Sequence, residues 1–136
     1  MYTVKKFFDK NQRIEVGNYD TFVIPFVIKY HAPIEGESYI FTVRRVTDCP
    51  ARAGKYPNLG DIVFQKTIHY SDVAPITDET GTAIGCYFCI NATKAETANI
   101  PAGLNAYDLA YACGDSEFEL IPPSEFWSGE VLRYEQ

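Results

Sequence analysis

Cysteine gives this chain its widest range of possible chemistry, and Cys86 and Cys89 have the C-x-x-C spacing of zinc and thiol–disulfide motifs. The surrounding segment 82–91 is predicted to be a β-strand, in which successive side chains point to opposite faces. Residues three apart then face opposite sides, so we do not expect these two thiols to hold one metal ion. There is no second C-x-x-C pair and no βαβ unit. We interpret Cys49, Cys86, Cys89 and Cys113 as reduced thiols that act as small buried hydrophobic residues.

The two histidines, His31 and His69, have no partner at the spacing of a metal or catalytic motif, and we expect both to be half-exposed. A G-x-S-x-G nucleophile elbow is absent, and the glycines of segment 81–85 lack the lysine and helix of a phosphate-binding loop. Glu117 and Glu119 are expected to be solvated acids, because a glycosidase pair must lie across a cleft. The sequence therefore predicts no catalytic residue, no metal ion and no cofactor.

The charge of the chain restricts its partners. It has 18 acidic and 12 basic residues and a formal net charge of −6, without the basic stripe that binds a phosphate backbone. No apolar run is long enough for a transmembrane helix, and segment 1–6 lacks the apolar region of a signal peptide. We therefore expect no contact with nucleic acid or with a membrane, and a protein that is made and kept in a cytoplasm.

The length of 136 residues suits one domain, 1–136, and the 15% aromatic content, mostly Tyr and Phe, favours strands. Short apolar or alternating segments separated by turn signals are predicted to be strands. These segments are 2–8, 13–16, 20–29, 38–46, 61–70, 82–91, 104–113, 117–121 and 126–134. Strands at this spacing without intervening helices indicate an all-β fold, an antiparallel β-sandwich of about seven to eight strands.

Segment 20–29 gives two opposing signals. It is apolar on both faces, which predicts a central strand, whereas Pro25 removes one ladder hydrogen bond and indicates an edge or a bulge. Residues 47–60 and 71–81 are expected to be irregular connections. Thr93–Glu96 has the pattern of a capping box, which predicts one helical turn.

The C-terminal half contains an ordered series of features. A strand over 81–91 leads into Thr93–Ile100, then into a Pro101-Ala102-Gly103 turn, a Tyr107-Asp108-Leu109 strand, and a last strand that ends Val131-Leu132-Arg133. Over residues 20–134, this series resembles the immunoglobulin-like modules of tailed-phage structural proteins, in particular the N-terminal domain of baseplate upper proteins. The resemblance implies an immunoglobulin-like β-sandwich that is assembled into a virion or a prophage tail and has no catalytic residues.

The resemblance also implies the partners, which are other phage structural proteins or copies of the chain in a homo-oligomer. It implies a virion component that is made in the cytoplasm of a bacterial host. More aromatic residues are present than a core of this size needs, and such side chains are favoured at protein interfaces. We assign the contact to Tyr107, Tyr111, Phe126 and Trp127. The alternative is a carbohydrate-binding β-sandwich that uses the same aromatic residues as a stacking platform.

Overall fold

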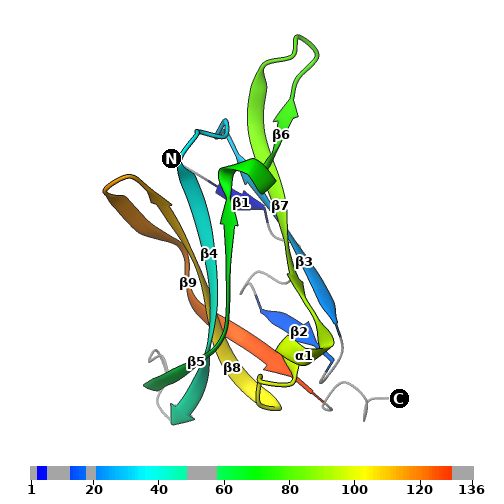
Figure 1. The fold of residues 1–136 in the computed structure, drawn as a ribbon, viewed down its shortest axis with the longest axis vertical. Helices are drawn as coiled ribbons and strands as arrows, with labels where there is room; N and C mark the ends of the chain where they lie inside the picture. The colour runs from blue at the N-terminus through cyan, green and yellow to red at the C-terminus, as the bar shows by residue number, and fades with distance from the viewer. Residues whose placement is uncertain (1–2, 6–12, 18–20, 49–57, 130–136) are drawn as a thin grey trace.

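Two β-sheets pack face to face in the computed structural model, which describes residues 3–5, 13–17, 21–48 and 58–129 (Figure 1). Cys49 lies outside these residues, as do most of connection 47–60 and the ends of the expected strands 2–8 and 126–134. The described part contains nine strands, one short α-helix and one 3-10 turn. The predicted all-β sandwich is confirmed.

The first sheet has four strands in the order β1-β3-β7-β6, all antiparallel. Their bounds are Thr3–Lys5 for β1, Phe22–Lys29 for β3, Ala83–Ala92 for β7 and Ala74–Thr77 for β6. Strand β6 lies in the connection 71–81 that was expected to be irregular, so that prediction was wrong. The strand has four residues and contains Pro75, which is the composition of a short edge strand and gives little sequence signal.

The second sheet has five strands in the order β2-β9-β8-β4-β5. Their bounds are Ile14–Val16 for β2, Ser116–Ser128 for β9, Gly103–Cys113 for β8, Glu37–Asp48 for β4 and Asn58–His69 for β5. All neighbours are antiparallel except β2, which runs parallel to β9. The two strand orders match the ABED and GFC sheets of an immunoglobulin domain, with β5 added beside the C strand and β2 added beside the G strand.

Strand β9 replaces two expected strands, 117–121 and 126–134, which the sequence separates by Pro122 and Pro123. The register between β8 and β9 shifts on both sides of Leu109, whose partner is Ile121. An irregularity of this kind lets a strand pass over residues that cannot donate to the ladder. The prolines therefore bend β9 without ending it.

Both signals from segment 20–29 are correct, because they refer to different halves of β3. Residues Val27–Lys29 pair with β1 on one side and β7 on the other, so this half is central. Pro25 pairs with Cys89 of β7, and no described strand pairs with it on the opposite side. Among the residues that the structure describes, the missing N–H of Pro25 therefore falls where β3 has only one neighbouring strand.

Aromatic rings from both sheets fill the space between them. Phe41 of β4 lies 6.0 Å from Phe26 of β3 and 5.5 Å from Tyr107 of β8, measured between ring centroids. Tyr39 stacks on Phe88 of β7 at 4.6 Å. Antibody domains join their sheets with a disulfide, whereas the cysteines in the described part of this chain are free and aromatic pairs span the gap.

The predicted capping box is confirmed and begins helix α1, Lys94–Thr97. The N–H of Glu96 donates to Thr93 Oγ1 at 3.2 Å, and the N–H of Thr93 donates to Glu96 Oε1 at 2.8 Å. These two bonds satisfy donors that a helix N-terminus leaves without partners. Among the residues that the structure describes, no helix is long and apolar enough to cross a membrane.

Candidate functional site

Three of the four aromatic residues assigned to an interface lie in the core. Tyr107, Tyr111 and Phe126 have exposed fractions of 4% or less, so the prediction that they form a surface contact was wrong. The physical reason is the two-residue period of a strand. Tyr107 and Tyr111 share the inner face of β8 with Leu109, and Phe126 pairs with the buried Asn105.

Trp127 is the one of the four that reaches the surface, where it is half-buried on the outer face of β9. Its Nε1–H donates to Glu125 Oε1 at 2.9 Å, and the guanidinium of Arg13 lies 4.9 Å from the ring centroid. Arg13 also pairs with Glu15 at 2.7 Å. One face of the indole is therefore covered and its N–H is bonded, which makes it a poor open platform for a sugar ring.

The two cysteines of the C-x-x-C segment lie as predicted, on opposite faces of β7. Cys86 is fully buried, as predicted, whereas Cys89 is only half-buried on the outer face, so the prediction of a buried residue was wrong for Cys89. Burial raises the pKa of the Cys86 thiol, the nearby Glu37 raises it further, and the hydrogen bond between Cys86 and Tyr39 partly offsets both. A thiol in these surroundings stays protonated, which excludes Cys86 as a nucleophile at neutral pH.

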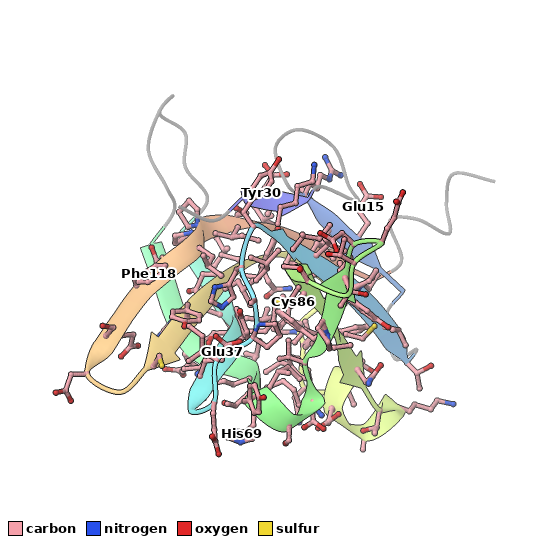
Figure 2. All side chains as sticks on the ribbon, turned by 90° about the horizontal axis from the view of Figure 1, so that it is seen from above. Glu15, Tyr30, Glu37, His69, Cys86 and Phe118 are labelled. Atoms are coloured by element: carbon pink, nitrogen blue, oxygen red, sulfur yellow. The ribbon has the colours of Figure 1, made fainter. Side chains whose placement is uncertain are left out.

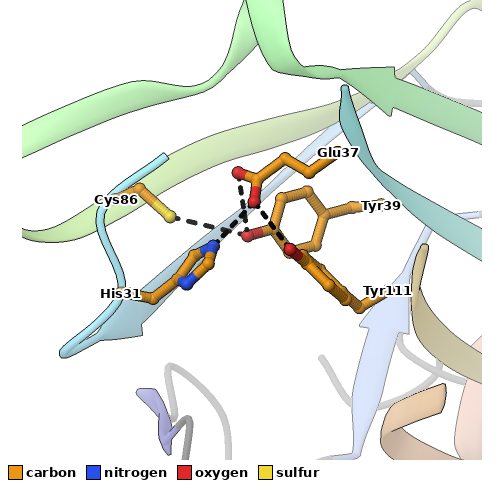
Figure 3. A network of polar contacts seen from close by, with 5 residues as sticks. All are labelled: His31, Glu37, Tyr39, Cys86 and Tyr111. Carbon is orange, nitrogen blue, oxygen red and sulfur yellow. Dashed lines mark hydrogen bonds and ion pairs between the residues drawn. The ribbon is translucent and has the colours of Figure 1, made fainter. Parts of the chain in front are cut away.

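A buried polar network lies at one end of the sandwich, centred on the carboxylate of Glu37 at the start of β4 (Figure 3). Glu37 Oε1 lies 2.7 Å from His31 Nε2 and accepts a hydrogen bond from the Tyr111 hydroxyl at 3.0 Å. Glu37 Oε2 accepts from the Tyr39 hydroxyl at 3.4 Å. Burial is the main cause that raises the pKa of Tyr39, so this hydroxyl keeps its proton.

Cys86 extends the network to the opposite sheet, because its Sγ lies 3.7 Å from the Tyr39 hydroxyl oxygen. The single proton of that hydroxyl is donated to Glu37, so the thiol acts as the donor to Tyr39. Figure 2 shows Glu37 and Cys86 between the two layers of the sandwich. The network thus connects the loop before β4, both sheets and the end of β8.

This network is a positioning device. All its members have exposed fractions of 5% or less, so a substrate does not reach the histidine or the carboxylate. A buried carboxylate is tolerated when several donors replace its hydration. The contacts fix His31, and with it the connection between β3 and β4, against β8. The expectation that His31 is half-exposed was therefore wrong.

Sequence reasoning missed Glu37, although one signal pointed to it. Tyr39, Phe41 and Val43 alternate on the inner face of β4, and the same two-residue period continued backwards places Glu37 on that face. The expected strand, 38–46, instead began one residue after it. No sequence spacing connects it to Tyr111, which is 74 positions away.

Glu117 and Glu119 are exposed on β9, as expected. Glu119 influences Asp108, which is half-buried on β8. Burial raises the pKa of Asp108, repulsion from Glu119 raises it further, and Arg44 lowers it. The Glu119 carboxylate on the adjacent strand therefore disfavours the charged form of Asp108.

Asp108→Asn is expected to stabilise the fold at neutral pH by up to about 1 kcal/mol, the scale of partly solvated charges. Because the pKa of Asp108 is raised in the folded state, the folded chain binds this proton more tightly than the unfolded chain. Wild-type stability therefore falls as the pH rises from the ordinary Asp pKa through the raised pKa of the folded state. Below the ordinary Asp pKa both states are protonated, so the gain should vanish there. Urea unfolding of both proteins at several pH values measures this, and an equal gain at all pH values would contradict a charge effect.

The outer face of the four-stranded sheet has a run of uncharged, mostly apolar side chains, which we call the apolar strip. Cross-strand pairs Val27–Tyr87 and Pro25–Cys89 form it, and Val23 continues it. Val23 is 62% exposed and Tyr87 is 46% exposed. At the Val23 end, the strip borders an open hollow of about 320 Å³ between β2 and the free edge of β3.

The apolar strip is the feature of this geometry that calls for a partner, since apolar side chains gathered on one face gain free energy when they are covered. The strip residues occupy the outer face of β3 and β7, whereas the residues between them face the core. Folding does not require apolar residues at these outer positions, which could have been polar. Comparison of the chain with models of known protein families gives no match, and comparison with the curated proteins gives none either.

Proposed function

We propose that this chain is a non-enzymatic assembly module that docks on a second copy of itself through the apolar strip. The setting that we propose is the tail or baseplate of a phage or prophage, as a virion component made in the host cytoplasm. The apolar strip is the observation that carries the docking, because Val23 and Tyr87 are large side chains left exposed in an ordered sheet. The resemblance of residues 20–134 to immunoglobulin-like phage modules supports the setting.

The charge of the chain favours the strip as the contact between copies. Two copies with a net charge of −6 repel each other, and docking needs a face that brings no like charges together. The strip contains no acidic or basic residue. In the described part of the sheet, the charged residues that border it on this face are both basic: Lys29 at the end of β3, and Lys5 of β1, whose backbone pairs with Val27. An interface that places one patch on the same patch of a second copy is the commonest arrangement in homo-oligomers.

Docking on protein is better supported than the carbohydrate alternative. A glycan platform was expected from Tyr107, Tyr111, Phe126 and Trp127, and three of these rings are in the core. The fourth is covered on one face by Arg13. We also propose that the chain has no catalytic role. This is supported by the burial of His31 and Glu37, a histidine and a carboxylate that lie within hydrogen-bond distance of each other.

Replacing Val23 and Tyr87 together with Ser is expected to weaken self-association at least about tenfold, which corresponds to 1.4 kcal/mol. Each substitution removes an exposed apolar side chain from the strip and should leave the fold intact. Light scattering over a wide range of protein concentration measures the effect. Ile62→Ser on β5 is the control. Ile62 is 45% exposed, close to the 46% of Tyr87, but it lies on the other sheet.

Thiol labelling reports on the same contact at a single residue. Cys89 lies in the strip, so its reaction with a maleimide should slow as self-association proceeds, whereas Cys113 at the end of β8 should keep its rate. A wild-type chain that remains monomeric at all concentrations would contradict docking on a second copy. Self-association that Ile62→Ser weakens as much as the strip variant would place the contact elsewhere.

A further inference from the structure

The acidic charge of the chain is concentrated at one end of the sandwich. The connections that follow β3, β5, β6 and β8, taken with the adjoining strand residues as 30–36, 69–73, 77–84 and 113–119, are all in the upper half of Figure 1, where the β8–β9 hairpin lies to the left of the others. They contain seven acidic residues, all of them exposed, and no lysine or arginine. Eleven acidic residues then remain against twelve basic ones in the rest of the chain, which is close to neutral. The molecule is therefore electrically asymmetric, and this end, the loop end, is its negative pole.

The loop end also exposes large apolar side chains, which is unusual for an acidic surface. Each of the four segments contains at least one exposed large apolar side chain. They are Tyr30, Ile34, Tyr70, Ile84 and Phe118. Five of the nine exposed large apolar residues in the described part of the chain are thus found at this one end. Figure 2, seen along the long axis, shows Tyr30 and Phe118 on different sides of the sandwich, Tyr30 at the end of β3 and Phe118 on β9.

The loop end is held in place from below by the buried polar network. His31 and Glu37 fix the two ends of the β3–β4 connection, and Tyr111 packs against Phe118 with ring centroids 5.2 Å apart. The N–H of Tyr30 donates to the carbonyl of Ile84 at 2.8 Å, which ties this connection to the start of β7. A surface held in this way loses little conformational entropy when it binds.

Tyr30 is held outward in a backbone conformation that favours glycine. Its φ is +64°, in the left-handed region, and it is the one described residue other than glycine with positive φ. Its side chain is 76% exposed, so no packing in the fold compensates for the strain. Such outliers persist where the position of the side chain has a use, and here the use would be contact with a partner.

We propose that the loop end binds a basic protein segment in which lysine or arginine alternates with apolar residues. Exposed apolar side chains give such a segment its contact area, and the surrounding carboxylates pair with its charges and steer its approach. A metal ion is a poorer fit, since no three His, Cys, Asp or Glu side chains come together to hold one in the described residues. A nucleic acid is repelled by the same charge. This surface contains no residue of the apolar strip, and the Lys29–Gly85 pair separates Tyr30 and Ile84 from the Val27–Tyr87 pair of the strip, so the inference goes beyond the proposed self-association.

A labelled synthetic peptide that alternates lysine with phenylalanine tests the proposal by fluorescence anisotropy. It should bind the wild-type chain at low ionic strength, and binding should weaken as salt screens the charges. Tyr30→Gly should weaken binding about tenfold, and it suits the local backbone, so the fold should be at least as stable. Glu35→Gln with Glu79→Gln should weaken binding to a similar degree.

Matched variants distinguish binding at the loop end from effects of net charge and of nonspecific apolar contact. Glu15→Gln with Asp61→Asn changes the net charge by the same amount away from the loop end, and Ile62→Ser removes an exposed apolar side chain from β5. Neither should affect the peptide. Equal losses from the control and loop-end variants would overturn the proposal, as would equal binding of a lysine–serine peptide or no binding at all. Self-association is measured separately, so the two proposals fail or stand independently.

Discussion

Glu37→Ala is expected to lower the free energy of unfolding by about 3–5 kcal/mol, the usual cost of removing one partner from a buried charged cluster. The Glu37 side chain is fully buried and faces the polar atoms of His31, Tyr111 and Tyr39. Without the carboxylate, these groups keep their desolvation cost and lose the bonds that offset it. Urea unfolding followed by circular dichroism measures the loss. A loss below about 1 kcal/mol would mean that water enters the site and solvates these groups.

Tyr111→Phe tests whether hydrogen bonding, and not packing, causes this loss. In the wild-type background it should cost about 1.5–3 kcal/mol, as expected for a hydrogen bond to a charged group. In the Glu37→Ala background it should cost much less, because the hydroxyl has already lost this acceptor at 3.0 Å. Strong non-additivity of the two substitutions is the expected signature of contact. Additive losses would show that Glu37 and Tyr111 act independently.

The sandwich was predictable because its strands alternate strictly. In β3, Phe22, Ile24, Phe26 and Ile28 all face the core, as the two-residue period indicates. Strand β6 and the continuous β9 were not predictable in this way. Four residues with a proline give too short a pattern for β6, and Pro122 and Pro123 normally end a strand. In both cases pairing with a neighbouring strand, β7 or β8, decides the outcome, and a single sequence does not contain that information.

The surface was less predictable than the fold. Aromatic residues were assigned to an interface by type, although type alone does not distinguish an inward from an outward position. The apolar strip was visible in part, because segment 20–29 was read as apolar on both faces. The loop end was not visible, since its four connections are separated in the sequence and meet only through the order of the strands. The buried carboxylate of Glu37 was missed because charged residues are normally exposed.

Phe126 and Trp127 are neighbours in β9, but they are expected to contribute very differently to stability, because Phe126 faces the core and Trp127 faces outward. Phe126→Ala is expected to lower the free energy of unfolding by about 3–5 kcal/mol, because the ring is fully buried beside Phe22 at 6.0 Å and Tyr107 at 6.3 Å. Trp127→Ala should cost no more than about 1 kcal/mol, mainly the contact with Arg13. Urea unfolding of both variants gives the comparison.

The same two variants also test where the chain docks. Trp127→Ala should leave self-association unchanged, because Trp127 lies on the five-stranded sheet and the apolar strip lies on the other one. If Trp127→Ala abolished self-association with the fold intact, the contact would belong to β2 and β9, and the original assignment of Trp127 to the interface would be correct. If it unfolded the chain as Phe126→Ala does, the indole would be a core residue. Retained folding is the outcome that the half-buried position of Trp127 predicts, and retained self-association is the outcome that docking through the apolar strip predicts.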